Sequence, residues 1–167
     1  MPGEGERHKR IRKTVEKDVR TYLQATGRKD SHRVIAAHEK GAGTISLFRG
    51  YPSRKSKMSD ADLIVVNDDD EVVCIIEVKD KDVRPKDLIG IIGATSMCNI
   101  ASHKDTGEMP LRKAALYIVV NSEGLGNQQS MKRQQLEIIN KEFAKGRDSV
   151  NKAVICSESE FPRYFRV

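Results

Sequence analysis

Glu77 and Lys79 are the residues whose types and spacing point most directly to chemistry. They form the only Asp/Glu-x-Lys triplet of the chain, and they end an apolar run that begins at Val72. In a strand, alternate side chains point to opposite faces, so even-numbered residues 72–78 are expected on one face and odd-numbered residues 73–79 on the other. A carboxylate and an ammonium that leave the same buried face need each other, water or a ligand. The triplet is therefore the first candidate for a reactive site.

Asp62 is the carboxylate that a hairpin would bring to the same place. It begins the apolar run 62–66, and a polar stretch separates this run from the next one, 72–78. Two strands joined by such a connection pair antiparallel, which places the start of the first beside the end of the second. We therefore expect Asp62 beside Glu77. Asp60 lies two residues earlier and is the competing candidate.

Two carboxylates and a lysine in one place suit the hydrolysis of phosphodiester bonds. Hard divalent cations such as Mg²⁺ prefer oxygen ligands and need only one or two protein carboxylates when substrate phosphate completes the coordination. Such a cation polarises the phosphate and lowers the pKa of a bound water. Lys79 would orient that water or stabilise the charge that develops on the phosphate. The competing interpretation is that these residues are solvated charges at strand ends, as in most isolated triplets of this kind.

At these residues the sequence resembles the PD-(D/E)xK nuclease superfamily, which includes many type II restriction endonucleases, archaeal Holliday-junction resolvases and repair nucleases. The matching residues are Asp62-Leu63-Ile64-Val65-Val66 and Cys74-Ile75-Ile76-Glu77-Val78-Lys79. The resemblance implies a restriction-endonuclease-like αβββαβ core. It also implies that Asp62, Glu77 and the carbonyl of Val78 bind Mg²⁺ or Mn²⁺, and that Lys79 acts on the attacking water.

The resemblance further implies a carboxylate from the first helix. Members of the superfamily often add one there, for which Glu16 is the candidate and Glu39 the second choice. A solvated helix charge is an equally good interpretation of Glu16. The residue before Asp62 is Ala61 instead of the proline that names the motif, and that proline is frequently absent from members.

The wider pattern predicts one α/β domain over residues 1–167, with a central mixed sheet flanked by helices. Residues 1–7 contain one proline and two glycines and are expected to form a flexible tail. The expected helices are 8–25, 85–101 and 128–145, and the expected strands are 44–49, 62–66, 72–78, 114–120 and 153–156. Residues 30–40 fit either a short helix or a strand. The helix at 85–101 is apolar nearly all round and should be largely buried, so the strands before and after it should be parallel neighbours.

The charge balance favours a polyanionic partner. The 30 Lys and Arg residues exceed the 24 Asp and Glu residues, which gives a net charge of +6, and a basic balance favours nucleic acid. The side chains expected to contact phosphate are Arg54, Lys55, Lys57, Lys81, Arg84 and Lys86. With four Tyr, four Phe and no Trp, duplex or branched DNA is favoured over single strands, whose bases stack on aromatic side chains.

Cysteine use and hydropathy predict an intracellular protein in a reducing compartment. Cys74, Cys98 and Cys156 are odd in number and widely spaced, which favours neither disulfides nor a zinc site. The start of the sequence lacks the apolar core of a signal peptide, and no run approaches the ~18 apolar residues of a membrane span. The four histidines show no HxH or HxxxH spacing, so ordinary surface positions are expected for them.

These observations favour a metal-dependent endodeoxyribonuclease acting on duplex or branched DNA. One such site cuts one strand at a time, so symmetrical double-strand cuts would require a homodimer or two binding events. A basic nucleic-acid-binding module without activity is the alternative from a different class, and the intact Asp62, Glu77 and Lys79 weigh against it. An RNA endonuclease resembling the cap-snatching domains of viral polymerases is the alternative among enzymes, in which a histidine such as His38 would join the metal.

Overall fold

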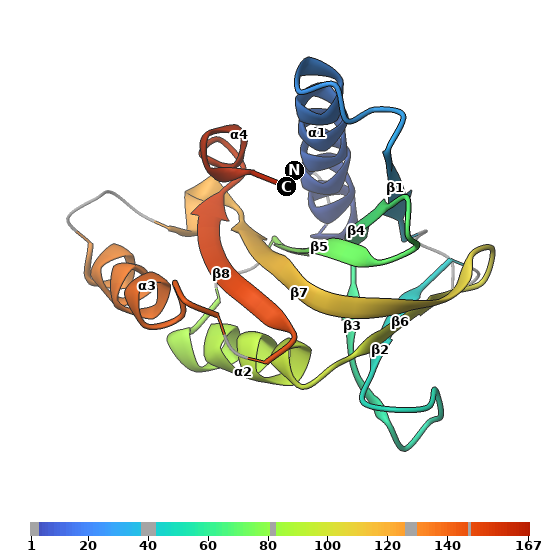
Figure 1. The fold of residues 1–167 in the computed structure, drawn as a ribbon. Helices are drawn as coiled ribbons and strands as arrows, with labels where there is room; N and C mark the ends of the chain where they lie inside the picture. The colour runs from blue at the N-terminus through green and yellow to red at the C-terminus, as the bar shows by residue number, and fades with distance from the viewer. Residues whose placement is uncertain (1–3, 38–42, 81–82, 126–129, 147) are drawn as a thin grey trace.

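In the described part of the chain, eight strands form a mixed sheet with helices on both faces (Figure 1). The computed structural model describes residues 4–37, 43–80, 83–125, 130–146 and 148–167. The helices are α1 (Glu4–Ala25), α2 (Pro85–Ser96), α3 (Met131–Glu142) and α4 (Phe161–Tyr164), with a 3-10 turn at Ser122–Gly124. The strands are β1 (His32–Ala36), β2 (Ile45–Phe48), β3 (Lys57–Ala61), β4 (Leu63–Asn67), β5 (Val72–Lys79), β6 (Ile100–His103), β7 (Gly107–Val120) and β8 (Val150–Ser157). The protein is α/β, with a sheet in which antiparallel pairs outnumber parallel ones.

The strand order is β1-β4-β5-β7-β6-β2-β3, and β8 pairs with β7. β5 runs antiparallel to β4 and parallel to β7, and β8 also runs parallel to β7. The first part of β7 pairs with β6, so this long strand connects the central strands to a wing made of β6, β2 and β3. Lys79 pairs with Val120, and Val120 pairs with Ser157. The carboxyl ends of three parallel strands therefore meet at one edge of the sheet.

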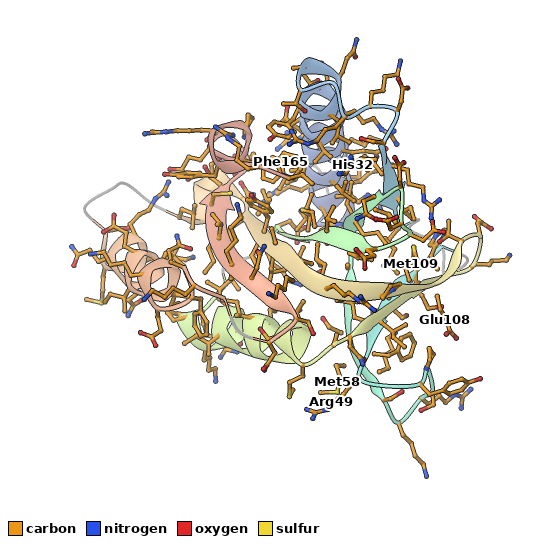
Figure 2. The ribbon with its side chains drawn as sticks, in the orientation of Figure 1. His32, Arg49, Met58, Glu108, Met109 and Phe165 are labelled. Atoms are coloured by element: carbon orange, nitrogen blue, oxygen red, sulfur yellow. The ribbon has the colours of Figure 1, made fainter. Side chains whose placement is uncertain are left out.

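Each face of the sheet is covered by its own apolar cluster. The side chains that cover the first face from α1 and the α4 region are Ile11, Val15, Val19, Leu23, Phe161 and Phe165. The opposite face is covered from α2 and α3 by Leu88, Ile92, Leu136 and Ile139. Figure 2 shows Phe165 on the α1 side and Met58 on the wing, on the side away from α1. Each fully buried Leu or Ile side chain stabilises by about 1.5–3 kcal/mol, so the two clusters hold β5 firmly between them.

β5 is buried on both faces up to Glu77, as its apolar run predicts. The even-numbered residues 74–78 face α1, and Ile75 faces α2. A bulge beginning at Val72 breaks the expected alternation, and Val72 joins the α2 side. The expectation for Val72 is wrong because a bulge inserts one extra residue and reverses the faces of the residues before it. Glu77 and Lys79 lie beyond the bulge and keep the face of Ile75.

The first segments differ from the expectation in two places. α1 begins at Glu4, so residues 4–7, which were expected in a tail, belong to the helix, while residues 1–3 lie outside the described residues. The segment 30–40, which fits a helix or a strand by sequence, contains β1, and β1 pairs with β4. Strand pairing decides between the two because five residues are too few for a stable helix of their own.

In the wing of the sheet, β2 confirms the strand expected at 44–49, but β3 and β6 were not predicted from the sequence. Residues 57–61, expected mostly in a loop, form β3, and residues 100–103 form β6 where the helix 85–101 was expected to end. β7 begins at Gly107, before the strand expected at 114–120. β3 and β6 are short and rich in polar residues, so their strand state comes from pairing with β2 and β7 and not from local preference.

α2 is half exposed, in contrast to the expectation that it is largely buried. Its buried residues are Leu88, Ile92, Thr95 and Ser96. Ile89 and Met97 are 46% and 39% exposed, and a methyl group at Gly90 or Gly93 would meet no atom within 4 Å. One side of α2 therefore presents bare backbone to solvent. No helix in the described ranges combines the length and the apolar character needed to cross a membrane.

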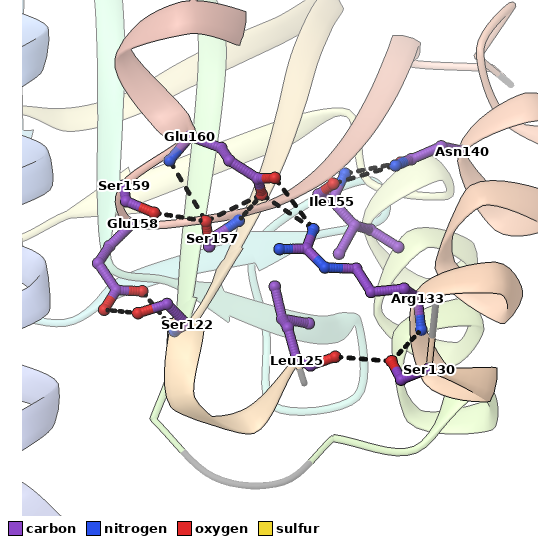
Figure 3. Close-up of polar contacts among 10 residues, drawn as sticks. All are labelled: Ser122, Leu125, Ser130, Arg133, Asn140, Ile155, Ser157, Glu158, Ser159 and Glu160. Atoms are coloured by element: carbon purple, nitrogen blue, oxygen red, sulfur yellow. Dashed lines mark hydrogen bonds and ion pairs between the residues drawn. The ribbon is translucent and has the colours of Figure 1, made fainter. Parts of the chain in front are cut away.

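The outer edge of β8 is closed by side chains from neighbouring segments (Figure 3). Asn140 of α3 donates to the carbonyl of Ile155 at 3.0 Å and accepts its N–H at 2.8 Å. Glu160 accepts the N–H of Ser157 at 2.9 Å and pairs with Arg133 at 3.1 Å. These bonds satisfy an edge that would otherwise pair with another chain. A pocket of about 520 Å³ beside this edge is lined by Arg133, Asn140 and Glu160, whose bonds run to the strand or to each other.

Candidate active site

Asp62 lies between β3 and β4 and is held against the end of β5. Its N–H donates to the carbonyl of Ile76 at 3.1 Å, and its Oδ2 accepts the N–H of Val78 at 2.7 Å. Its carbonyl accepts the N–H of Ala37 at 2.8 Å, just beyond β1. The side chain is only 16% exposed. The hairpin of β4 and β5 therefore places the Asp62 carboxylate beside the Glu-x-Lys triplet.

Glu77 and Lys79 form an ion pair at the end of β5. Lys79 Nζ donates to Oε1 of Glu77 at 2.6 Å. The side chain of Lys79 is 33% exposed and that of Glu77 is 14% exposed. Burial raises the pKa of Glu77 to about 7 against the opposing charge of Lys79, and the charge of Asp62 adds to the rise. Burial disfavours the ionised carboxylate, and one lysine does not compensate for it. The site therefore favours a further positive charge near Glu77.

His8 is the member of the site that sequence reasoning missed. Its Nε2 lies 3.3 Å from Oδ1 of Asp62. The pKa of His8 is raised, first by its hydrogen bond to Asp62, with further effects from the charges of Asp62 and Asp80 and the main chain of Val78, while burial opposes the rise. A signal was present, because His8 precedes Ile11 by three residues and so shares the buried side of α1. The absence of paired histidine spacing hid it.

A pocket of about 650 Å³ opens beside these residues. It lies within the size range of ligand-binding clefts. Among the residues that line it are His8 of α1, Met58 of β3, Lys79 of β5, Asp80 and Gly90 of α2. Oδ2 of Asp80 is buried, and no described residue bonds to it. Burying a polar atom without a hydrogen-bond partner costs free energy. Oδ2 of Asp80 is therefore an acceptor in the pocket whose hydrogen-bonding capacity is not satisfied within the described chain.

Asp60 is bound on the wing and not against β5. Its Oδ1 lies 2.8 Å from Nζ of Lys57 and accepts the hydroxyl of Ser46 at 3.1 Å, and its side chain is 51% exposed. Asp62, by contrast, bonds to the strand that carries Glu77. Between the two aspartates that the sequence leaves open, the geometry places Asp62 with the triplet.

Glu16 does not join this group. Its Oε1 accepts from Arg20 at 2.8 Å on the surface of α1. A helix rises about 1.5 Å per residue, so Glu16 lies about 12 Å further along α1 than His8, which is the residue that contacts Asp62. The expectation of a helical carboxylate at Glu16 is therefore not met, because the amino end of α1 lies at the site and not its middle. Glu39 and its neighbour at position 38 lie outside the described residues.

The loop before β3 carries the first group of expected phosphate contacts. Arg54 and Lys55 are exposed there. Lys57, at the start of β3, is engaged by Asp60. Two of these three cations are therefore available on the wing.

The segment after β5 carries the second group. Arg84 precedes α2, and its Nε lies 2.9 Å from Oδ2 of Asp87. This ion pair is exposed to solvent and is therefore weak. Lys86 is exposed in the first turn of α2, and Lys81 lies outside the described residues.

The donor atoms at Asp62 and Glu77 fit a hard divalent cation in their chemistry. Both carboxylates and the main-chain carbonyl of Val78 offer oxygen, the ligand atom that Mg²⁺ and Mn²⁺ prefer. The raised pKa of Glu77 marks a carboxylate that a second cation would stabilise. Within the described ranges, no three His, Cys, Asp or Glu side chains are gathered as a metal site. The protein would thus supply two carboxylates, and substrate phosphate and water would complete the coordination.

Comparisons with known proteins leave the chain without an assigned family. No family model, no curated protein and no solved structure matches it. A fold alone does not define an activity, so the function is argued from the residues of the site.

Proposed function

We propose that this protein is a metal-dependent endonuclease that hydrolyses phosphodiester bonds in DNA. Asp62, Glu77 and Lys79 form its active centre. The observation that carries the proposal is the bond between the Asp62 carboxylate and the N–H of Val78 at 2.7 Å, the residue between Glu77 and Lys79. The three side chains that the motif requires are thus held at one edge of the sheet.

The order of elements supports a likeness to the PD-(D/E)xK nucleases. The series α1, β1, β4, β5, α2, β7 reads αβββαβ, with β2 and β3 inserted after β1 and with β6 inserted before β7. β1, β4 and β5 are antiparallel neighbours, and β7 is parallel to β5. The candidate site lies at the carboxyl end of β5, the end at which open α/β sheets bind ligands.

The residues of the site have distinct parts in the proposed reaction. Asp62, Glu77 and the carbonyl of Val78 would hold Mg²⁺ or Mn²⁺, which when bound polarises the scissile phosphate and acidifies a water molecule. The ammonium of Lys79 would orient the attacking water or stabilise the charge that develops on phosphate oxygens. Loss of one such donor costs about 10²–10³ in rate. His8, 3.3 Å from Asp62, would hold that carboxylate in place.

DNA is the proposed substrate, and RNA is the alternative. The net charge of +6 supports binding to either polyanion. The contact of His8 with Asp62 favours the alternative, because the cap-snatching RNA endonucleases that share the motif use a histidine at the metal. A homodimer is part of the proposal only where cuts occur symmetrically in both strands, which would require two such sites.

A cleavage assay with matched variants tests the proposal. Supercoiled plasmid, linear duplex, four-way junction and RNA are each incubated with the protein in Mg²⁺, in Mn²⁺ and in EDTA. The variants are Asp62→Asn and Lys79→Ala, and Asp60→Asn is the control because it makes the same change two residues away. We expect cutting only with metal, a loss of about 100-fold or more in the two site variants, and near wild-type cutting in the control.

Three results would contradict the proposal. Cutting that persists in Asp62→Asn or in EDTA would remove these residues from the reaction. Salt-dependent retention of DNA without any cutting would establish a binding module instead. Cutting of RNA alone would replace DNA by the alternative substrate.

A further inference from the structure

The outer face of α1 is a row of basic side chains. The apolar residues of this helix, Ile11, Val15, Val19 and Leu23, all face the sheet. The exposed basic residues of the same helix are Lys9, Arg10, Lys13, Lys17 and Arg20. Spacings of three and four residues place Arg10, Lys13 and Lys17 on one side of a helix. This side lies opposite the apolar stripe, so it points away from the sheet.

Three cations of this face, Arg10, Lys13 and Lys17, are not paired within the part of the chain that the structure describes. Arg20 is bound by Glu16 at 2.8 Å. Within the described part of the chain, by contrast, Arg10, Lys13 and Lys17 form no side-chain hydrogen bond or ion pair. Lys57 and Arg84, from the two groups predicted to bind phosphate, are each paired with an aspartate. The row on α1 is therefore a set of available cations, as are Arg54, Lys55 and Lys86.

The row begins near the level of the candidate active site along the helix axis, on the opposite side of α1. His8, in the same helix, lines the pocket and contacts Asp62, and Arg10 follows it by two residues. At about 1.5 Å per residue, Arg10 and Lys17 are about 10 Å apart along the axis, and Lys13 and Lys17 about 6 Å apart. A nucleic-acid strand that follows the outer face of α1 would therefore meet cations in steps that suit contacts to neighbouring phosphates.

We propose that the outer face of α1, through Arg10, Lys13 and Lys17, binds the phosphate backbone of the nucleic acid that enters the candidate active site. This inference rests on the proposed function. An anionic membrane is a less suitable partner, because interfacial helices insert an apolar face into the lipid and the apolar side of α1 is buried against the sheet. Contacts to phosphate alone read no base sequence, so this surface provides affinity and orientation and not sequence specificity.

The test is the salt dependence of binding in the absence of cleavage. A labelled DNA duplex is titrated in EDTA at salt concentrations from about 50 to 200 mM. The variant is the triple substitution Arg10→Ala, Lys13→Ala and Lys17→Ala, all at exposed helical positions where alanine favours the helix. The slope of log K against log salt is negative, and loss of three phosphate contacts should make it shallower by about 2.7.

A matched variant separates the position of the charges from their number. Lys29→Ala, Lys104→Ala and Lys145→Ala removes the same net charge from exposed positions outside α1. This control should keep a slope close to that of the wild type. The conservative triple variant Arg10→Lys, Lys13→Arg and Lys17→Arg should also keep it, because each position retains its charge.

The outcomes distinguish this inference from the proposed function. If the wild type cuts DNA and the α1 triple variant binds with an unchanged slope, the surface is wrong and the nuclease assignment stands. If the α1 alanine variant and the control variant at Lys29, Lys104 and Lys145 reduce the salt dependence equally, only net charge matters and the surface is again wrong. If the wild type binds anionic vesicles but neither cuts nor binds nucleic acid, both proposals fail.

Discussion

Replacing Glu77 with glutamine should stabilise the metal-free protein at alkaline pH. The pKa of Glu77 rises from an ordinary value of 4.5 to about 7 because the carboxylate is buried. Between these values the folded protein holds a proton that the unfolded chain releases, so the free energy of unfolding falls as pH rises through this window. A rise of this size corresponds to about 3 kcal/mol at about 1.4 kcal/mol per pKa unit. Glutamine carries no charge and avoids this cost.

The assay is urea unfolding in EDTA near pH 5 and near pH 8. Wild type and Glu77→Gln should have similar midpoints near pH 5, because the Glu77 carboxyl is then protonated in the folded protein and most of the cost of burying its charge is absent. Near pH 8 the variant should unfold at a urea concentration higher by about 1.5 M, for a slope of about 2 kcal/mol per molar. Lys79 loses its partner in the variant, but its side chain is 33% exposed, so water solvates its ammonium.

Adding Mg²⁺ or Mn²⁺ near pH 8 extends the test to the proposed metal. A ligand at about 100 times its Kd stabilises the folded state by about 2.7 kcal/mol, and the wild type should gain more than Glu77→Gln. Glu108→Gln is the control, because Glu108 is exposed on β7 (Figure 2). The reasoning is refuted if Glu77→Gln is no more stable than the wild type near pH 8, or if Glu108→Gln reproduces its gain.

Three further predictions concern single side chains. His8→Ala should lower the urea midpoint more near pH 5 than near pH 8, because a raised pKa marks stability that is present when the imidazole is charged and is lost as pH rises; equal losses would contradict it. Gly90→Ala should raise the free energy of unfolding by about 0.5–1 kcal/mol, because its methyl group meets open space, whereas Gly146→Ala should lower it, since φ is +66° and the methyl would meet the carbonyl oxygen of Val150 at 2.0 Å. Asn140→Ala should cost about 1–3 kcal/mol in urea unfolding, because two bonds that close the edge of β8 are lost.

The hairpin that carries Asp62 and Glu77 was predictable because its determinants are local. Two apolar runs and a short polar connection define two strands, and the pairing of β4 with β5 confirms the prediction. The emergence of Glu77 and Lys79 from a strand buried on both faces is also confirmed, since strand alternation depends only on residue order. The bulge at Val72 escaped prediction because no sequence feature there distinguishes an inserted residue from a regular one.

Contacts between distant segments were not predictable in the same way. His8 meets Asp62 because α1 docks with its amino end at the carboxyl end of β5, whereas the spacing of His8 from Ile11 predicts only that His8 faces the sheet. The same docking carries Glu16 away from the site and turns Lys13 and Lys17 to solvent. Asp60 and Asp62 could not be ranked with certainty until the pairing of β2 with β3 tied the first to Lys57 and Ser46.

Residue order was therefore enough to locate the acidic and basic groups of the β4–β5 hairpin. These groups are brought together by one short connection, whose geometry follows from the residues within it. The surroundings of the hairpin followed only from packing: which helix end contacts Asp62, how deeply Glu77 is buried, and which cations remain available. Such features depend on how the segments dock across the sheet, and the free energy of docking is distributed over both apolar clusters and belongs to no single motif.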